Sequence, residues 1–553
     1  MTTVDGGQAV RAPGTRPRVV CLGGGFVAVY LVKALRRAIR RREIDVTIIS
    51  RDNFHTFHGF VPEMLGSRIQ PGQIISPARR LFAPATVHTA QVEAVDLERR
   101  VVTTSRRLDG RQFEVPFDHL VLGLGARDDL ERYPGLAEHA LTLSNYADAL
   151  KARNHLIGVM EMAAIEADPQ ERARLLTVVV AGGNFGGVEV ATELDDYLRG
   201  VTRKVYPTIG AEEVRVVLVH AGDRLLTELD TRQPKLQRWA QRFVTDHTGI
   251  ELRLERRVAA ATPTEVMLDD GEHVPTRTLI SCAGIAQSPL LDTLPFDRDA
   301  RGRVVTDRFV RATGTANVWA GGDCSAVPHP RGGTNPPLAI FAMATGWRIG
   351  RNILQTARGR PLRPYRFTEL GDACSLGRRR AIAHVRGLRV TGFPAWLLWR
   401  GFLLYFLPSG DRKLRIVLDW MVTPFVGRDV AQLQLDERMG VRREVYEPGQ
   451  EIVTEGDIGQ RLYVIQTGEV EVVQATSPAG SEAAPLAKLG PGDHFGEIAV
   501  FEGTRRSATV RAVSRVEVLS LGRELARSLS DASGRIGAQL RRLPTGPDHE
   551  GEQ

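Results

Sequence analysis

The spacing of hydrophobic and polar positions changes several times along the chain, and each change predicts a different kind of element. An apolar run from Arg18 leads into a glycine cluster and then into apolar residues at helical spacing up to Leu35. This succession predicts a strand, a tight turn and a helix. It recurs in LLTVVVAGGNFGGVEVATEL, and a third apolar run, NVWAGGDC, ends in Gly322 and Asp323. Repeated strand and helix units predict an α/β fold with parallel sheets, here two Rossmann-like dinucleotide-binding domains.

The pattern becomes all-β after about residue 437. The stretch YEPGQEIVTEGDIGQRLYVIQTGEVEVV alternates apolar and polar residues over short runs that are separated by turn glycines. Such alternation predicts antiparallel strands. We expect the C-terminal domain to be an all-β jelly roll with flanking helices.

Composition limits the class of protein. A chain of 553 residues with 42% hydrophobic and 25% charged residues is typical of a soluble globular protein of three or four domains. Its net charge of +8 fits solubility or an anionic partner. The four cysteines form no C-x-x-C pair, so we expect neither disulfides nor a dithiol centre, and a reducing cytoplasm fits. Residues 1–17 have no apolar core and predict a disordered tail, not a signal peptide.

The first glycine cluster has the form of a dinucleotide-binding turn. Gly23, Gly25 and Ala28 stand in a G-x-G-x-x-A arrangement, in which the second glycine lets a pyrophosphate approach the backbone. A plain strand-to-helix turn is the alternative. The carboxylate that usually follows about twenty residues later is replaced by Ser50, with Asp52 two residues beyond it.

The second cluster is less regular. Gly182, Asn184 and Gly187 occupy the three glycine positions, and the side chain of the asparagine would crowd a pyrophosphate. The next strand ends in His220 where an NAD site usually has a glutamate. His220 with Arg224 would meet a 2′-phosphate and favour NADPH, but a surface histidine explains the pattern equally well, so the choice of nucleotide stays open.

Five motifs in order, GGGFVA, LVLGLGA, VVVAGGNFGGVE, LISCAG and VWAGGDC, resemble the flavoproteins with two dinucleotide-binding domains, and most of all the type II NADH dehydrogenases. The resemblance spans Arg18 to Leu435. It implies FAD as cofactor and NAD(P)H as substrate. The implied FAD residues are Gly23, Gly25, Ala28, Ser50, Asp52, Val92, Gly125, Gly322 and Asp323. The implied nicotinamide nucleotide residues are Gly182, Gly183, Asn184, Gly187, His220 and Gly284, with Glu189, Ala339 and Ile340 as catalytic residues.

The quinone motif of this family is altered. After Pro336 and Pro337 the family has A-Q-x-A-x-Q, whereas Ile340 and Ala344 replace the two glutamines here. Apolar residues can form a slot for a quinone ring, but they cannot orient its carbonyl groups. A quinone acceptor therefore follows only from the resemblance.

Residues 391–408, TGFPAWLLWRGFLLYFLP, are aromatic and apolar. The run is too short to span a bilayer and is interrupted by Arg400, but with the cationic residues near 412–415 it suits the membrane interface. We expect Trp396, Trp399 and Phe406 to form that surface. A buried helix or a homodimer interface is the alternative.

The stretch LGPGDHFGEIAVFEGTRRSATVRAV resembles the phosphate cassette of cyclic nucleotide-binding domains. The resemblance implies that Gly496 and Glu497 bind the ribose 2′-hydroxyl and that Arg506 and Ser507 bind the cyclic phosphate, with cAMP favoured by the serine. A structural jelly roll with an empty pocket is the alternative. No helix-turn-helix follows, so we expect no nucleic acid partner.

We therefore predict a disordered tail (1–17), a FAD-binding domain (18–150 and 295–350), an NAD(P)H-binding domain (151–294), a membrane-docking region (351–436) and a cyclic nucleotide-binding domain (437–545). The predicted function is NAD(P)H oxidation through FAD to an acceptor, a membrane quinone first, at the cytoplasmic face of the cell membrane. We expect no metal site. A catalytically weakened cAMP-sensing scaffold and an NADPH-dependent reductase of a non-quinone acceptor are the alternatives.

Overall fold

The computed structural model describes residues 16–229, 233–367, 371–432, 441–457, 459, 461–473, 485–502, 504–522 and 525–526. Residues 1–15 of the predicted tail and the chain beyond residue 526 therefore lie outside the described residues.

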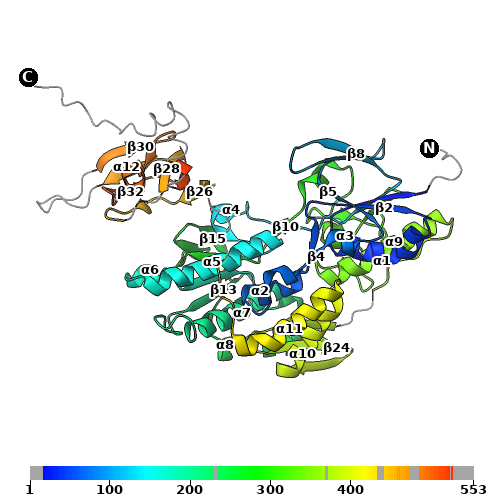
Figure 1. Cartoon of the computed structure of the whole chain (residues 1–553), viewed down its shortest axis with the longest axis horizontal. Helices are drawn as coiled ribbons and strands as arrows, with labels where there is room; N and C mark the ends of the chain where they lie inside the picture. The colour runs from blue at the N-terminus through cyan, green and yellow to red at the C-terminus, as the bar shows by residue number, and fades with distance from the viewer. Residues whose placement is uncertain are drawn as a thin grey trace, which may run out of the picture.

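The first sheet is parallel, in the order β21-β9-β1-β2-β5. Its strands are β1 (Arg18–Leu22), β2 (Asp45–Ser50), β5 (Thr86–Thr89), β9 (His119–Leu122) and β21 (Val318–Ala320). Helices α1 (Phe26–Arg40) and α9 (Ala339–Ala357) lie side by side next to it (Figure 1). A Cβ atom at Gly346 would lie only 2.4 Å from the carbonyl oxygen of Val27, so glycine permits this close helix pair.

Smaller elements complete this part of the chain. They are β3 (Phe54–Thr56), α2 (Val61–Leu65), β4 (Ile75–Pro77), α3 (Ala78–Leu81), β6 (Gln91–Asp96), β7 (Val101–Ser105), β8 (Gln112–Pro116), β20 (Val304–Val305) and β22 (Ser325–Ala326).

The second sheet is also parallel, in the order β11-β18-β12-β13-β14. It consists of β11 (Ala140–Leu141), β12 (Thr177–Ala181), β13 (Arg215–His220), β14 (Ile250–Leu254) and β18 (Thr278–Ser281), with helices α5 (Tyr146–Ile165), α6 (Pro169–Leu175), α7 (Phe185–Thr202) and α8 (Pro234–His247). A three-stranded antiparallel sheet, β15 (Val258–Ala261), β16 (Glu265–Leu268) and β17 (His273–Pro275), is inserted before β18. The central strands β1, β12 and β13 are almost wholly buried, which explains their continuous apolar runs.

Two short strands carry the chain between the sheets. β10 (Arg127–Asp128) follows β9 and pairs antiparallel with β19 (Ile285–Ala286), which follows β18. A short helix, α4 (Leu136–His139), lies between β10 and β11. Because the chain leaves the first sheet through β10 and returns through β19, this pair is the connection between the two domains.

The region after α9 contains a small sheet and two helices. The sheet is β23 (Gly371–Ser375), β24 (Ala381–Val385) and β25 (Leu388–Thr391), and the helices are α10 (Gly392–Phe406) and α11 (Gly410–Val426). Among the described residues, no helix combines the length and the apolar character that crossing a bilayer requires.

The C-terminal domain consists of two antiparallel sheets, β26-β33-β28-β31 and β27-β32-β29-β30. Its elements are β26 (Val441–Tyr446), β27 (Glu451–Val453), β28 (Arg461–Thr467), β29 (Val470–Val473), β30 (Pro485–Leu489), β31 (His494–Phe495), α12 (Glu497–Glu502), β32 (Thr509–Ala512) and β33 (Val516–Gly522). Residues from both sheets share one core. The predicted fold class, two parallel Rossmann-like sheets followed by an antiparallel β domain, is therefore confirmed.

Candidate functional site

The first glycine turn is closed on one side and open on the other. Gly23 has φ of +105°, and a Cβ atom there would lie 2.2 Å from the carbonyl oxygen of Gly123. Gly25 caps the N-terminus of α1, and a Cβ atom there would meet nothing within 4 Å. Ala28 is fully buried against the sheet. The turn therefore leaves space beside Gly25 and the free N–H groups of a helix N-terminus, which suits a pyrophosphate.

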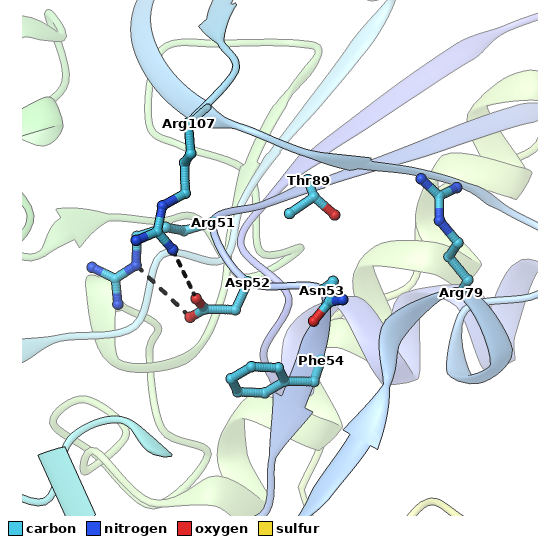
Figure 2. Close-up of a pocket in the computed structure, with 7 residues that line it drawn as sticks. All are labelled: Arg51, Asp52, Asn53, Phe54, Arg79, Thr89 and Arg107. Atoms are coloured by element: carbon cyan, nitrogen blue, oxygen red, sulfur yellow. Dashed lines mark ion pairs between the residues drawn. The ribbon is translucent and has the colours of Figure 1, made fainter. Parts of the chain in front are cut away.

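A polar hollow of about 390 Å³ lies next to this turn, where β2 and β5 end (Figure 2). Its lining residues are Arg51, Asp52, Asn53, Phe54, Arg79, Thr89 and Arg107. Asp52 forms ion pairs with Arg51 (3.8 Å) and Arg107 (3.6 Å). Ser50 is buried between the hollow and the turn, since a Cβ atom at Gly24 would lie 2.5 Å from its Oγ. Nucleotides bind at such carboxyl edges of parallel sheets, so the hollow is placed for the adenosine end of a dinucleotide.

The closing motif lies at the same edge. Gly322 follows β21 with φ of +70°, and a Cβ atom there would lie 3.1 Å from Val27 Cγ2. Burial raises the pKa of the neighbouring Asp323, while the charge of Arg303 opposes that shift. Gly125 also has positive φ, +68°, and a Cβ atom there would meet nothing within 4 Å. Val92 is half-buried on β6 and packs against the apolar core under the sheet.

His55 is a residue of this site that sequence reasoning did not single out. Its Nδ1 lies 3.0 Å from the carbonyl oxygen of Gly24, so Nδ1 is the protonated nitrogen. Burial lowers the pKa of His55 to about 4, and its Nε2 has no hydrogen-bond partner among the described residues. The ring therefore presents an unsatisfied acceptor beside the glycine turn. The HTFHGF segment gave no signal by itself, because its spacing matches no dinucleotide motif.

These observations fit FAD. The glycine turn is open beside Gly25, where a phosphate would lie, the adenosine side has a hollow lined mainly by polar and charged side chains, and the partly buried Asp323 can accept hydrogen bonds from hydroxyl groups. The structure thus brings the turn, Ser50, Asp52, Gly322 and Asp323 to one edge of one sheet.

The second glycine turn is equally tight. Gly182 has φ of +113°, and a Cβ atom at Gly187 would lie 1.7 Å from the carbonyl oxygen of Gly182. Asn184 has φ of −83°, so this position does not require glycine. Its Oδ1 accepts a hydrogen bond from Thr227 Oγ1 (3.2 Å), which holds the side chain towards the loop after β13.

His220 is folded under this turn. The backbone N–H of Gly183 donates to His220 Nδ1 at 3.0 Å, and a Cβ atom at Gly183 would lie 2.7 Å from the ring. The side chain is 9% exposed, and burial lowers its pKa. His220 is therefore a buried, neutral ring and does not lie on the surface.

The predicted catalytic residues lie on two helices. Glu189, in α7, is buried, and its Oε1 accepts from the N–H of Ser375 at 3.0 Å. Burial raises the pKa of Glu189 to about 8, and the charge of Glu63 adds to this shift. Ala339 is exposed and Ile340 is half-buried at the start of α9. Gly284 has φ of +80° and faces Asp129 at the connection between the domains.

The predicted cyclic nucleotide cassette is centred on Arg506. Its Nη1 donates to the carbonyl oxygen of Gly496 (2.7 Å) and its Nη2 to that of Arg461 (2.8 Å). Arg506 and Glu497 are each 8% exposed, and Glu497 Oε2 has no partner among the described residues. Ser507 is exposed. A buried guanidinium beside an unsatisfied carboxylate oxygen fits a ligand that carries both an anionic group and a hydroxyl.

Two linked dinucleotide sites in one chain define the class of protein, a pyridine nucleotide-dependent flavoprotein oxidoreductase. Residues 17–346 match the sequence profile of the pyridine nucleotide-disulphide oxidoreductases, and the chain belongs to this family. Within the family it is a type II NADH:quinone oxidoreductase-like enzyme. Residues 443–533 match the cyclic nucleotide-binding domain, which confirms the predicted combination.

Named relatives support this placement. The chain is 27% identical over 420 residues to a probable NADH dehydrogenase of Dictyostelium discoideum, covering 75% of this chain and 91% of that one. It is 28% identical over 446 residues to the type II NADH:quinone oxidoreductase NdhA of Mycobacterium tuberculosis, covering 77% and 91%. The solved structure of NDH2 from Plasmodium falciparum with NADH has the same fold, with a TM-score of 0.68 at 16% identity over 75% of this chain and all of that one.

Proposed function

We propose that the protein oxidises NAD(P)H through FAD, passes the electrons to a membrane quinone, and responds to a cyclic nucleotide, with cAMP as the favoured ligand. The observation that carries this proposal is the pair of glycine turns, each at the carboxyl edge of its own parallel sheet and joined through β10 and β19. The names of its relatives support the choice of NADH and a quinone as substrates.

Bound FAD supplies the two-electron chemistry between the nicotinamide and the acceptor. The residues of the chain bind and orient the reactants. The turn at Gly25 would hold the pyrophosphate, Asp323 would accept from ribityl hydroxyl groups, and the turn at Gly182 would hold the nicotinamide nucleotide.

Reduction of a quinone also consumes protons, and Glu189 is the residue we propose to supply one. With a pKa of about 8, its carboxyl group is largely protonated at neutral pH and can donate to an acceptor oxygen. Ile340 and Ala339 would line the apolar slot for the ring.

The test is to mix the purified protein anaerobically with NADH or NADPH. We expect the flavin absorbance near 450 nm to disappear within seconds and to return when a soluble quinone is added. A protein that carries FAD but is not bleached by either nucleotide would favour the scaffold alternative. Bleaching without reoxidation by quinone would favour a different acceptor.

Replacing His220 with glutamate is expected to shift the nucleotide preference towards NADH. A carboxylate at the end of β13 accepts from a ribose 2′-hydroxyl and repels a 2′-phosphate, whereas the neutral ring does neither. One hydrogen bond to a charged group, about 1.5–3 kcal/mol, corresponds to a change in KM of roughly tenfold or more. Steady-state kinetics with NADH and with NADPH measure this change in KM. Unchanged constants at normal FAD content would exclude His220 from the nucleotide site.

We also propose that α10 and α11 dock on the inner face of the cell membrane, but not through the residues expected from the sequence. That expectation is wrong for Trp396, which is 9% exposed and lies under Arg400 (3.9 Å to the ring centre). Trp399 and Phe406 are only partly exposed and pack against the core. Arg400 points inward because Glu63 pairs with it at 3.0 Å. The exposed apolar side chains are instead Phe393, Leu397, Leu398, Tyr405, Leu414, Leu418, Met421, Val422, Phe425 and Val426.

Replacing Leu418, Met421 and Phe425 together with serine should release the protein from liposomes. These side chains are 50%, 61% and 90% exposed, so replacing them removes less packing than replacing a buried side chain. Burying each fully would contribute about 1.5–3 kcal/mol, so the bound fraction in a sedimentation assay should fall steeply. The matched control replaces Leu108 and Ile165, which are exposed elsewhere, with serine. Equal binding of both variants and the parent would contradict docking through this surface.

A further inference from the structure

The C-terminal domain contacts the segment that joins the two dinucleotide-binding domains. The backbone N–H of Val445, in β26, donates to His139 Nε2 of α4 at 3.2 Å. Arg443 Nε lies 3.7 Å from Glu138 Oε1 in the same helix. Gln450 Nε2 donates to Glu265 Oε1 of β16 at 2.7 Å. Figure 1 shows β26 next to α4.

The helix α4 also contacts β15 on its other side. Gly135, which precedes it, has φ of +74°, and a Cβ atom there would lie 1.8 Å from the carbonyl oxygen of Ala261. Burial lowers the pKa of His139 to about 4, although the charge of the nearby Glu444 opposes the shift. His139 is therefore neutral, and its Nε2 can accept the Val445 hydrogen bond.

The segment that carries α4 is the connection between the domains. It runs from β10, which pairs with β19, to β11, which is the edge strand of the second sheet. The N–H of Asp129 also lies 3.5 Å from the carbonyl oxygen of Gly284, at the end of the expected nicotinamide site. A displacement of α4 would therefore act on β10 and, through its pairing, on β19, the two strands that join the flavin domain to the nicotinamide domain.

Inside the C-terminal domain, a continuous set of hydrogen bonds links the cassette to β26. Arg506 Nη2 donates to the backbone carbonyl oxygen of Arg461 at 2.8 Å. The side-chain Nε of Arg461 donates to Ser520 Oγ at 3.0 Å. Ser520 Oγ in turn donates to Glu444 Oε1 at 2.5 Å. Glu444 directly precedes Val445, the residue that binds His139. A phosphate that engages Arg506 competes with the Arg461 carbonyl at the first of these bonds.

We propose that β26 and α4 form the contact through which the cyclic nucleotide controls the oxidoreductase, by changing how the two dinucleotide-binding domains are placed relative to each other. The inference rests on the proposed regulation by a cyclic nucleotide and identifies its route. A ligand shifts the equilibrium between two arrangements of the domains only if it binds one arrangement more tightly than the other. Couplings of this kind change affinities by roughly 5- to 150-fold.

The experiment compares Gln450→Glu, Glu265→Gln and the double variant in the full-length holoprotein. The first substitution places two carboxylates against each other, and adding the second in the double variant restores a donor and acceptor pair in reversed order. NAD(P)H oxidation with a soluble quinone is measured with and without saturating cAMP, together with cAMP affinity. The matched control is Glu451→Gln, which affects the pair with Arg511 (3.2 Å) and the hydrogen bond from Thr454 Oγ1 (3.3 Å), both inside the C-terminal domain.

We expect Gln450→Glu to reduce the effect of cAMP on the oxidation rate to less than about twofold, the double variant to restore it, and the control to retain it. cAMP affinity measured without NAD(P)H should persist in all of them. If the parent responds to cAMP and Gln450→Glu responds equally, the route is wrong while the regulation stands. If the parent itself does not respond, the regulation fails and the route with it.

A second measurement covers the case in which Gln450→Glu loses its FAD. Hydrogen exchange in the parent should change at the Val445 amide and across residues 134–141 when cAMP is added, because that amide hydrogen bond crosses the contact. The Arg506→Leu variant should show no such change. Exchange that is identical with and without cAMP in the parent would overturn the proposal.

Discussion

A Gly25→Val variant is expected to fold and to purify without the yellow colour of a bound flavin. A Cβ atom at this position meets no protein atom within 4 Å, and Gly25 has an ordinary φ of −81°, so valine disturbs the protein little. The branched side chain instead fills the space beside the turn that a pyrophosphate would occupy. Losing two hydrogen bonds to a charged group, about 1.5–3 kcal/mol each, weakens binding roughly a hundredfold or more.

The measurement is the ratio of flavin absorbance at 450 nm to protein absorbance at 280 nm, with circular dichroism as the test of folding. Gly72→Val is the matched control, because a Cβ atom at Gly72 also meets nothing within 4 Å. The absorbance ratio of Gly25→Ala should fall between those of Gly25→Val and Gly72→Val. A folded Gly25→Val protein with a full complement of FAD would show that the pyrophosphate binds elsewhere.

An Arg506→Leu variant is expected to lose cAMP binding. The guanidinium is buried, and two carbonyl oxygens hold it in position within the predicted phosphate cassette. Removing one partner from a buried, hydrogen-bonded charge pair costs about 2–5 kcal/mol, which weakens binding by roughly 30- to 4,000-fold. Isothermal titration with cAMP measures the change.

The adjacent arginine provides the control. Arg505 is exposed, and its Nη1 donates to the carbonyl oxygen of Gly456 at 2.7 Å. Arg505→Leu removes the same charge one residue away and should leave cAMP affinity within about threefold, as expected for an exposed group. If both substitutions weaken binding equally, the effect is one of overall charge, and Arg506 is not the phosphate ligand.

Much of the fold could be predicted because its signals are local. The apolar run from Arg18 forms β1, and the glycine clusters lie where β1 and β12 turn into α1 and α7. Apolar runs of strand length and glycines at positive φ depend on a few neighbouring residues, so the sequence displays them directly.

The site could be predicted only in part. The orientation of Trp396 was missed because an arginine at a helical position normally points to solvent, whereas Arg400 is drawn inward by Glu63, 337 residues earlier in the chain. His55 was missed because its role depends on the carbonyl group of Gly24, which the fold brings to it. Neither contact has a local signature.

By itself the sequence determined the class of this protein: two dinucleotide-binding units, their order, and a cyclic nucleotide cassette at the end. Tertiary structure alone decided which way the functional side chains face and where the C-terminal domain docks. The bond between His139 and Val445 joins residues 306 positions apart. Such a contact depends on the burial and relative position of two separately folded parts, and nothing in the residues next to either partner encodes it.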